Sequence, residues 1–294
     1  MTPRRTFAVL LPDGRTLQLG QRTLIMGILN ITPDSFADGG VHFDVGRAVE
    51  AGLRMAEDGA DILDVGGEST RPGADEVGAV EEMRRVLPVV ERLAAQTTAV
   101  ISIDTYKAVV AREAVARGAA IINDISGLQY DPELAAAAAD TRAALVLMHT
   151  RGRSRTMYDL AVYQDVVGEV RAELNQAIDR ATAAGVRREA VILDPGFGFA
   201  KKADHSYTLL ARLSELAALE RPILSGPSRK SFLKQSLGER LPAEREWGTA
   251  AAVTASVLAG AHIVRVHGVA NMSDVVRVAD LVRREGRTPL EPPP

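Results

Sequence analysis

Short apolar runs alternate with longer segments of helical period over most of the chain. Eight such runs follow one another, at residues 24–31, 61–65, 99–103, 119–125, 143–148, 190–193, 222–225 and 262–266. Apolar strands that alternate with amphipathic helices are typical of repeated βα units and a parallel sheet. Eight units are the number that closes a barrel. The pattern therefore predicts an α/β protein, a (β/α)8 TIM barrel that occupies residues 1–294 as a single domain.

The first residues do not follow this pattern and predict an N-terminal β-hairpin over residues 1–22. Two short apolar segments, 6–11 and 16–19, flank a turn at Asp13-Gly14, as in a hairpin whose loop contains glycine. We expect the hairpin to cover one end of the barrel. The last residues, 287–294, end in three prolines, and we expect this tail to be frayed.

Helix signals mark the segments between the runs. Residues 77–95 and 158–184 predict long helices, and the wide gap before the last run predicts a further helix that contains Trp247. A glycine stands before four of the runs, where helix C-termini favour a left-handed residue: Gly59, Gly118, Gly185 and Gly260.

Composition narrows the classes of function. Hydrophobic residues make up 46% of the chain and charged residues 25%, as in an ordinary globular protein with a full core. A formal net charge of -3 gives no general attraction to nucleic acid or to an anionic membrane, although a local basic cluster can still bind a small anion. The absence of cysteine excludes disulfides, zinc-thiolate sites and a thiol nucleophile. No apolar run has the length of a membrane span, and we expect a cytoplasmic enzyme.

Polar side chains follow almost every predicted strand. In chain order they are Asn30, the segment 68–71, Asp104, Asn123 with Asp124, His149, Asp194, the segment 228–231, and Arg265 with His267. In a parallel barrel the carboxyl ends of the strands share one face, which carries the active site of barrel enzymes. A single residue of this kind can be a helix cap or a loop anchor. Eight in succession instead predict a polar binding site on this face.

Asp104, Asn123 and Asp194 form the first of two candidate sets. They are short side chains with carbonyl oxygens, suited to a flat heterocycle that has several N–H donors along one edge. Met148 and Phe199 are candidates for apolar contact with the faces of that ring. The alternative for Met148 is a place in the core.

The second set is basic and predicts an anion site. Residues 228–231, with the sequence SRKS, open the helix expected after the seventh strand, where backbone N–H groups and the helix dipole favour an anion. Arg265 and His267 leave the eighth strand on the same side. The alternative for Arg265 is a salt bridge to a carboxylate at the barrel mouth. Asn30 and the acids of the loop that follows it suggest oxygen ligands for Mg²⁺.

Eight stretches resemble the motifs of one enzyme family, dihydropteroate synthase. They are MGILNITPDSFADGG at 26–40, DILDVGGESTRPGA at 61–74, ISIDTYK at 101–107, IINDISG at 121–127, VLMHTRG at 146–152, ILDPGFGF at 192–199, SGPSRKSF at 225–232 and RVHG at 265–268. The resemblance implies a pterin-binding (β/α)8 barrel that condenses 6-hydroxymethyl-7,8-dihydropterin pyrophosphate with p-aminobenzoate in the presence of Mg²⁺. It also implies a dissociative substitution, in which pyrophosphate leaves first, a homodimer, and inhibition by sulfonamides.

The resemblance implies a role for each matching position. The pterin would contact Asp104, Asn123, Met148, Asp194 and Lys230. Asn30 would bind Mg²⁺ and, with Arg265 and His267, the pyrophosphate. The aminobenzoate pocket and its loops would include Asp34, Ser35, Phe36, Thr70, Arg71, Pro72, Phe199 and Ser231. The catalytic residues would be Asp104, Lys230 and Asn30.

Three positions depart from the family's pattern, namely Gly268, Thr150 and Ser206. They affect local loop contacts and leave every implied binding position filled. Two alternative functions share the pterin set. One is a barrel that transfers a methyl group from methyltetrahydrofolate to a corrinoid protein, and the other is a catalytically silent pterin-binding paralogue.

Overall fold

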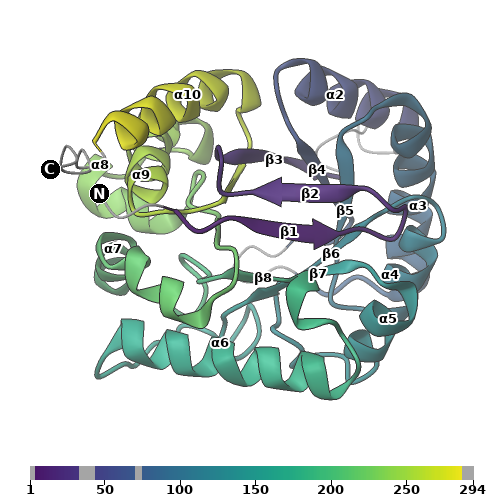
Figure 1. The fold of residues 1–294 in the computed structure, drawn as a ribbon, viewed down its shortest axis with the longest axis horizontal. Helices are drawn as coiled ribbons and strands as arrows, with labels where there is room; N and C mark the ends of the chain where they lie inside the picture. Colours follow the sequence, from purple (N-terminus) through teal and green to yellow (C-terminus); the bar gives the residue numbers. More distant parts are fainter. Residues whose placement is uncertain (1–3, 33–43, 70–74, 287–294) are drawn as a thin grey trace, which may run out of the picture.

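The computed structural model describes residues 4–32, 44–69 and 75–286. Within these ranges the chain forms a β-barrel, a ring of helices around it and a separate β-hairpin (Figure 1). The predicted tail from residue 287 onward lies outside the described residues, as do six predicted loop positions: Asp34, Ser35, Phe36, Thr70, Arg71 and Pro72.

Eight parallel strands form the barrel, and each overlaps one predicted apolar run. They are β3 (Leu24–Asn30), β4 (Ile62–Gly66), β5 (Val100–Asp104), β6 (Ile121–Asp124), β7 (Ala144–Met148), β8 (Val191–Asp194), β9 (Leu224–Ser225) and β10 (Ile263–Val266). The strand order is β8-β7-β6-β5-β4-β3-β10-β9, and a parallel bridge between Leu193 and Ile223 joins the two edges of the sheet. The predicted TIM barrel is confirmed. Strand β9 begins two residues later than predicted, because Pro222 has no N–H to donate and the N–H of Ile223 donates to His262 Nδ1 rather than to a neighbouring strand.

The helices that cover the barrel follow the strands in alternation. They are α2 (Val45–Glu57), α3 (Ala79–Gln96), α4 (Ala108–Val115), α5 (Leu134–Thr141), α6 (Val166–Ala183), α7 (Ala203–Ala211), α8 (Lys234–Leu237), α9 (Glu246–Leu258) and α10 (Val269–Glu285). Short 3₁₀ helices lie at Arg188–Ala190, Leu213–Leu219, Ser231–Leu233 and Pro242–Arg245. The predicted helix with Trp247 is α9, and the four predicted glycines all have positive φ at helix ends.

Helix α6 begins eight residues later than predicted, at Val166 rather than at 158. The side chain of Glu169 accepts hydrogen bonds from the backbone N–H groups of Gln164 and Asp165, at 2.7 and 3.0 Å. These bonds satisfy donors that a helix start leaves free. The capping contact therefore sets the first residue of α6, and the residues before it form a loop at the barrel mouth.

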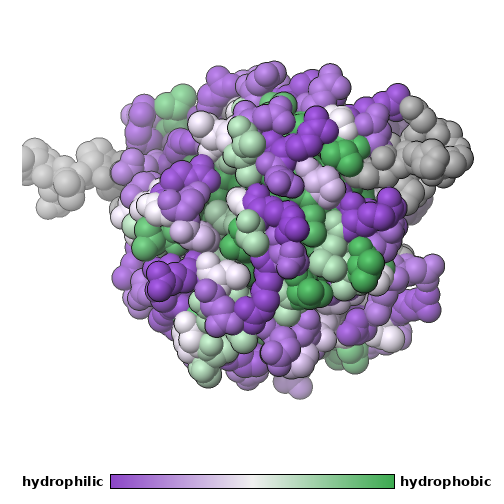
Figure 2. All heavy atoms as spheres, turned by 90° about the vertical axis from the view of Figure 1, so that its right-hand side faces the viewer, coloured by the Kyte–Doolittle hydropathy of each residue, from purple (hydrophilic) through white to green (hydrophobic). Residues whose placement is uncertain are grey.

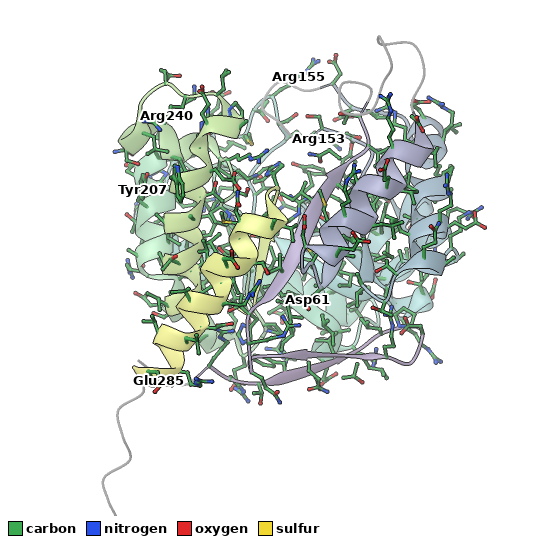
Figure 3. All side chains as sticks on the ribbon, turned by 90° about the horizontal axis from the view of Figure 1, so that it is seen from above. Asp61, Arg153, Arg155, Tyr207, Arg240 and Glu285 are labelled. Atoms are coloured by element: carbon green, nitrogen blue, oxygen red, sulfur yellow. The ribbon has the colours of Figure 1, made fainter. Side chains whose placement is uncertain are left out.

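The barrel interior contains an apolar layer at the amino ends of its strands. Met26, Ile62 and Ile121 point inward there and share one hydrophobic cluster with Val9 and Leu19 of the hairpin. The hairpin, β1 (Phe7–Leu10) paired with β2 (Thr16–Leu19), covers this end of the barrel as predicted. Figure 3 shows the hairpin at the end opposite Arg153 and Arg155. The open mouth is therefore at the carboxyl ends of the strands.

The outward-facing strand residues build a second core between the sheet and the helices. Leu29, Val65 and Ile103 belong to it, together with the inner faces of α2 to α10. Because successive strand residues point to opposite sides, the residues between these outward positions face the barrel interior. Towards the mouth those interior residues change from apolar to polar.

Candidate active site

A layer of polar side chains lies above the apolar layer, at the carboxyl ends of the strands. We call it the polar layer, and its members are Asn30, Asp64, Ser102, Asp104, Asn123, Asp194 and Arg265. Strand register brings them to neighbouring heights, since Asp104 pairs with both Gly66 and Asn123, and Asp64 pairs with Ser102. Five of the seven were predicted from the strand ends.

Arg265 holds the centre of the polar layer. Its Nε donates to Asp64 Oδ2 at 2.6 Å, and its Nη2 donates to Asp104 Oδ2 at 2.6 Å. The amide of Asn123 donates from Nδ2 to the same oxygen of Asp64 at 2.8 Å. This bond orients the Asn123 amide, so its Oδ1 is the atom left to accept from a ligand. The alternative expected for Arg265, a salt bridge at the barrel mouth, is therefore present.

The charges of this network depend on burial. Burial raises the pKa of Asp104 to about 7, and the Asp64 carboxylate adds to the rise while Arg265 opposes it. Burial also disfavours the charged form of the Arg265 guanidinium. The carboxylates of Asp64 and Asp104 outweigh this effect and raise the pKa of Arg265. Arg265 is thus charged at neutral pH, and the carboxylate of Asp104 is easier to protonate than an exposed one. A ligand that donates to Asp104 shifts it to the carboxylate form.

Asp64 was missed by the sequence analysis. It lies two residues before the end of β4, in the middle of Ile62–Gly66, and its side chain is fully buried. The available signal was an acid inside an otherwise apolar strand, because a buried carboxylate needs partners. Its Oδ1 is buried without a hydrogen-bond partner among the described residues. The carboxylate of Asp64 thus holds the side chains of Arg265 and Asn123 in place.

Asp194 and its surroundings form the side of the mouth next to β7. Its Oδ1 accepts from the backbone N–H of Gly196 at 2.7 Å, and burial raises the pKa of Asp194. Met148 is its register partner on β7. Met148 and Phe199 pack together in a small apolar cluster separate from the two main cores. The predicted heterocycle site therefore has acceptors and an apolar wall at the same end of the barrel.

Lys230 connects this wall to the carboxylates. Its ammonium lies 4.0 Å from the centre of the Phe199 ring, in cation–π contact. Burial lowers the pKa of Lys230 to about 8, and Arg265 adds to this, while Asp194 and Asp104 favour the charged form. Lys230 is therefore mostly protonated at neutral pH and can donate to a ligand placed between Phe199 and the carboxylates.

The segment 228–231 differs in part from its prediction. Ser231 opens a 3₁₀ turn and a single α-helical turn rather than a long helix, so the helix dipole contributes less than expected there. Arg229 is turned away and pairs with Glu246. Ser228 Oγ lies 3.0 Å from His267 Nδ1, which places His267 beside this segment. The two parts of the predicted anion set are thus adjacent.

Asn30 ends β3 at the rim of the polar layer and is partly exposed. Among the residues that the structure describes, no group of three His, Cys, Asp or Glu side chains is arranged to hold a metal ion. An Mg²⁺ site built from protein side chains alone is therefore not found within 4–32, 44–69 and 75–286. The amide oxygen of Asn30 fits an Mg²⁺ ion that is bound chiefly by water and by substrate phosphates.

Comparisons with known proteins agree with this geometry. The family model described as "pterin binding enzyme" matches residues 26–267. A dihydropteroate synthase from Synechocystis is 47% identical over 275 residues, which cover 93% of this chain and 95% of the relative.

Two solved structures are similar over nearly the whole chain. Dihydropteroate synthase from Xanthomonas albilineans with 4-aminobenzoic acid has a TM-score of 0.87 and 45% identity, covering 95% of this chain and 99% of that chain. The Yersinia pestis enzyme in complex with a sulfonamide drug has a TM-score of 0.86 and 43% identity, covering 91% and 97%. The family model, the relatives and the polar layer point the same way: this chain belongs to the dihydropteroate synthase family of pterin-binding enzymes.

Proposed function

We propose that the chain condenses 6-hydroxymethyl-7,8-dihydropterin pyrophosphate with p-aminobenzoate to give 7,8-dihydropteroate and pyrophosphate. The observation that carries the proposal is the polar layer, with Asp104, Asn123 and Asp194 around Arg265, in a chain that matches dihydropteroate synthases over most of its length. The name of the Synechocystis relative favours the synthase over the corrinoid methyltransferase alternative.

The pterin edge carries N–H donors that match the acceptors of the polar layer. Asp194 uses Oδ1 for Gly196, so Oδ2 can accept from the ring. Asn123 offers Oδ1 because its Nδ2 is held by Asp64. Lys230, above Phe199, would donate to the ring from the opposite side. The ring would lie against Met148, which supplies apolar contact.

The chemistry requires charge stabilisation rather than a protein nucleophile. As pyrophosphate leaves, positive charge develops on the pterin methylene, and the carboxylate of Asp104 favours that charge. Arg265 and His267 would stabilise the negative charge that develops on the departing pyrophosphate. The aniline nitrogen of aminobenzoate then forms the new C–N bond and loses a proton. Phe199 and Ser231 would line the aminobenzoate side.

We propose Mg²⁺ as the cofactor, with Asn30 as its protein ligand. When bound, Mg²⁺ would neutralise negative charge on the pyrophosphate.

A product assay tests the whole function. The purified chain with both substrates and Mg²⁺ should release one pyrophosphate for each dihydropteroate formed, and EDTA should stop the reaction. Absence of both products under these conditions would refute the proposed reaction.

The activity should have a bell-shaped pH dependence. Below a pH of about 7 Asp104 is protonated, accepts more weakly from the pterin and no longer favours positive charge, and above about 8 Lys230 loses its proton. We expect kcat/KM for the pterin substrate to rise through the first pKa and fall through the second, because kcat/KM reports groups of the free enzyme. The measurement is kcat/KM across about pH 5.5 to 9.5. Asp104→Asn should remove the acidic limb, and a flat wild-type profile would argue against these roles.

We also propose a homodimer formed through α9 and α10, which pack side by side (Figure 1). The predicted contact was the segment 249–261, but most of its large side chains face the barrel. The outer face instead carries exposed apolar side chains among charged ones, with Trp247 83% exposed and Val278 62% exposed. The face over α3 and α4 shows hydrophilic residues with hydrophobic ones between them (Figure 2) and carries the ion pairs Glu81–Arg84 and Arg112–Asp140.

Light scattering coupled to size exclusion tests this surface. Trp247→Glu should convert a dimer into a monomer, because aromatic residues at the centre of an interface carry much of its binding energy. Val80→Glu, at an equally exposed apolar position on α3, is the matched control and should remain dimeric. A wild-type monomer at micromolar concentration would contradict the proposal.

We expect the protein in the cytoplasm. No helix in the described ranges has the length and apolar character of a membrane span.

A further inference from the structure

The loop between β8 and α7 is held in an unusual conformation. Gly196, Gly198 and Ala200 have φ values of 69°, 75° and 48°, a region that residues with a side chain rarely adopt. A Cβ atom at Gly196 would lie 2.1 Å from the carbonyl oxygen of His149. The loop thus passes very close to the loop after β7, and it carries Phe199 at its tip.

Three side chains bind consecutive carbonyl oxygens of this loop. The hydroxyl of Tyr158 donates to Gly198 O at 3.3 Å, and that of Tyr163 donates to Ala200 O at 3.0 Å. Between them, Lys201 Nζ donates to Phe199 O at 2.9 Å. Lys201 differs from the tyrosines because it brings a charge into the interior, where only 2% of the residue is exposed.

Lys201 also binds the neighbouring loop after β7. Its Nζ lies 2.8 Å from His149 Nδ1 and 3.4 Å from His149 O. His149 Nε2 lies 3.0 Å from Glu173 Oε2 on α6, and Glu173 is paired with Arg151. A continuous chain of polar contacts therefore runs from the carbonyl of Phe199 to the outer helix layer.

The pKa values of Lys201, His149 and Glu173 indicate which of these three side chains carry a proton. Burial lowers the pKa of Lys201 to about 7 and that of His149 to about 4. Burial alone would raise the pKa of Glu173, but hydrogen bonds from His149 and Arg151 outweigh it and lower the pKa to about 2. The shared proton therefore rests on Lys201, and neutral His149 donates from Nε2 to the Glu173 carboxylate.

A charged lysine has three donors, and three acceptors are present. They are Phe199 O, His149 O and His149 Nδ1, from two different loops. No neutral side chain supplies three donors at one atom. Burying an ammonium group costs free energy, and neutral hydrogen bonds between the two loops would avoid that cost. The position bound most directly is the backbone of Phe199, whose ring lies under Lys230.

We propose that Lys201 is a positioning residue for the aminobenzoate pocket, which holds Phe199 against Lys230 through the chain Lys201–His149–Glu173. The proposal rests on the proposed function, because Phe199 belongs to the aminobenzoate side of the site. Lys201 itself touches no substrate. Its removal should loosen the wall on which aminobenzoate packs and leave the acceptors Asp104 and Asn123, which bind the pterin, unchanged.

The test compares KM values for the two substrates in Lys201→Met, which keeps the length of the side chain and removes its donors. We expect KM for p-aminobenzoate to rise at least about tenfold, with KM for the pterin substrate changed less than about twofold. Lys202→Met, at the exposed neighbouring position, is the matched control and should match wild type. Product formation by wild type and by this control establishes the synthase reaction independently of the outcome at Lys201.

Unchanged KM values for both substrates would overturn the proposal, because a merely structural residue changes the amount of folded enzyme, and with it Vmax, but not KM. A rise of both KM values by the same factor would also overturn it, because the effect would then not be confined to the aminobenzoate side. If Lys201→Met does not fold, Glu173→Gln decides. This change weakens the outer end of the chain, so KM for p-aminobenzoate should rise about two- to threefold with KM for the pterin unchanged. Unchanged values for both substrates in Glu173→Gln would also overturn it.

Discussion

Replacing Arg265 by methionine should lower the free energy of unfolding by about 3–5 kcal/mol, because it leaves two buried carboxylates unpaired. The side chain of Asp64 is fully buried and that of Asp104 is 8% exposed, and both bind the guanidinium at 2.6 Å. The same change should reduce kcat/KM by roughly 10²–10³, the usual effect of removing one stabilising donor. Denaturant unfolding and steady-state kinetics measure the two effects.

Two variants make the Arg265 result specific. Arg229→Met removes an arginine of the neighbouring loop that pairs with the half-buried Glu246, and its effect on stability should be much smaller. Adding Asp64→Asn to Arg265→Met should recover part of the stability, since one unpaired charge disappears. The resemblance to the family alone implied that Arg265 chiefly binds pyrophosphate. A variant with wild-type stability and weaker pyrophosphate binding would support that narrower role and contradict ours.

Asp194→Ala should weaken pterin binding by about 1–3 kcal/mol or more, because a ring N–H group would lose a buried charged acceptor. This corresponds to a loss of roughly 5- to 150-fold in affinity. Calorimetric titration of the pterin substrate measures it. Asp194→Asn is the informative companion, because its side-chain oxygen can still accept from Gly196 and keep the loop in place.

The control for Asp194 is Asp204→Ala, an exposed carboxylate at the start of α7. Its pterin affinity should equal that of wild type. If Asp194→Asn also binds pterin as wild type does, the charge of Asp194 has no part in recognition. If Asp194→Ala keeps full affinity, the residue serves only to hold Gly196.

The barrel was predictable because its strands are separated by helical segments of clear period. All eight apolar runs became strands, and the signal came from local patterns alone. The errors arose where one contact overrode the pattern. Helix α6 starts late because Glu169 caps it, and β9 starts late because the N–H of Ile223 donates to the side chain of His262. The helix expected at Ser231 is short, and no pattern in SRKSF marks its length.

Residues at the strand ends were predictable for a similar reason. In a parallel barrel, the end of a strand already fixes the side of the molecule, so Asp104, Asn123 and Asp194 could be placed together without knowledge of their contacts. Asp64 lies deeper in the barrel and was not found, although an acid within an apolar strand was a usable signal. The pairing of Lys201 with His149 joins loops 52 positions apart, and no local pattern reports such a pair.

The polar layer binds the pterin ring through carboxylates, and burial raises the pKa of one of them, Asp104, in the free protein. Titration of 6-hydroxymethylpterin at pH 7 in buffers of different ionisation enthalpy measures proton release on binding. A ring that donates to Asp104 should release protons on binding, because it stabilises the carboxylate form of a group whose pKa is raised by burial. Asp104→Asn should bind more weakly and release none. Equal affinity in the two proteins, with no proton release in either, would contradict the account.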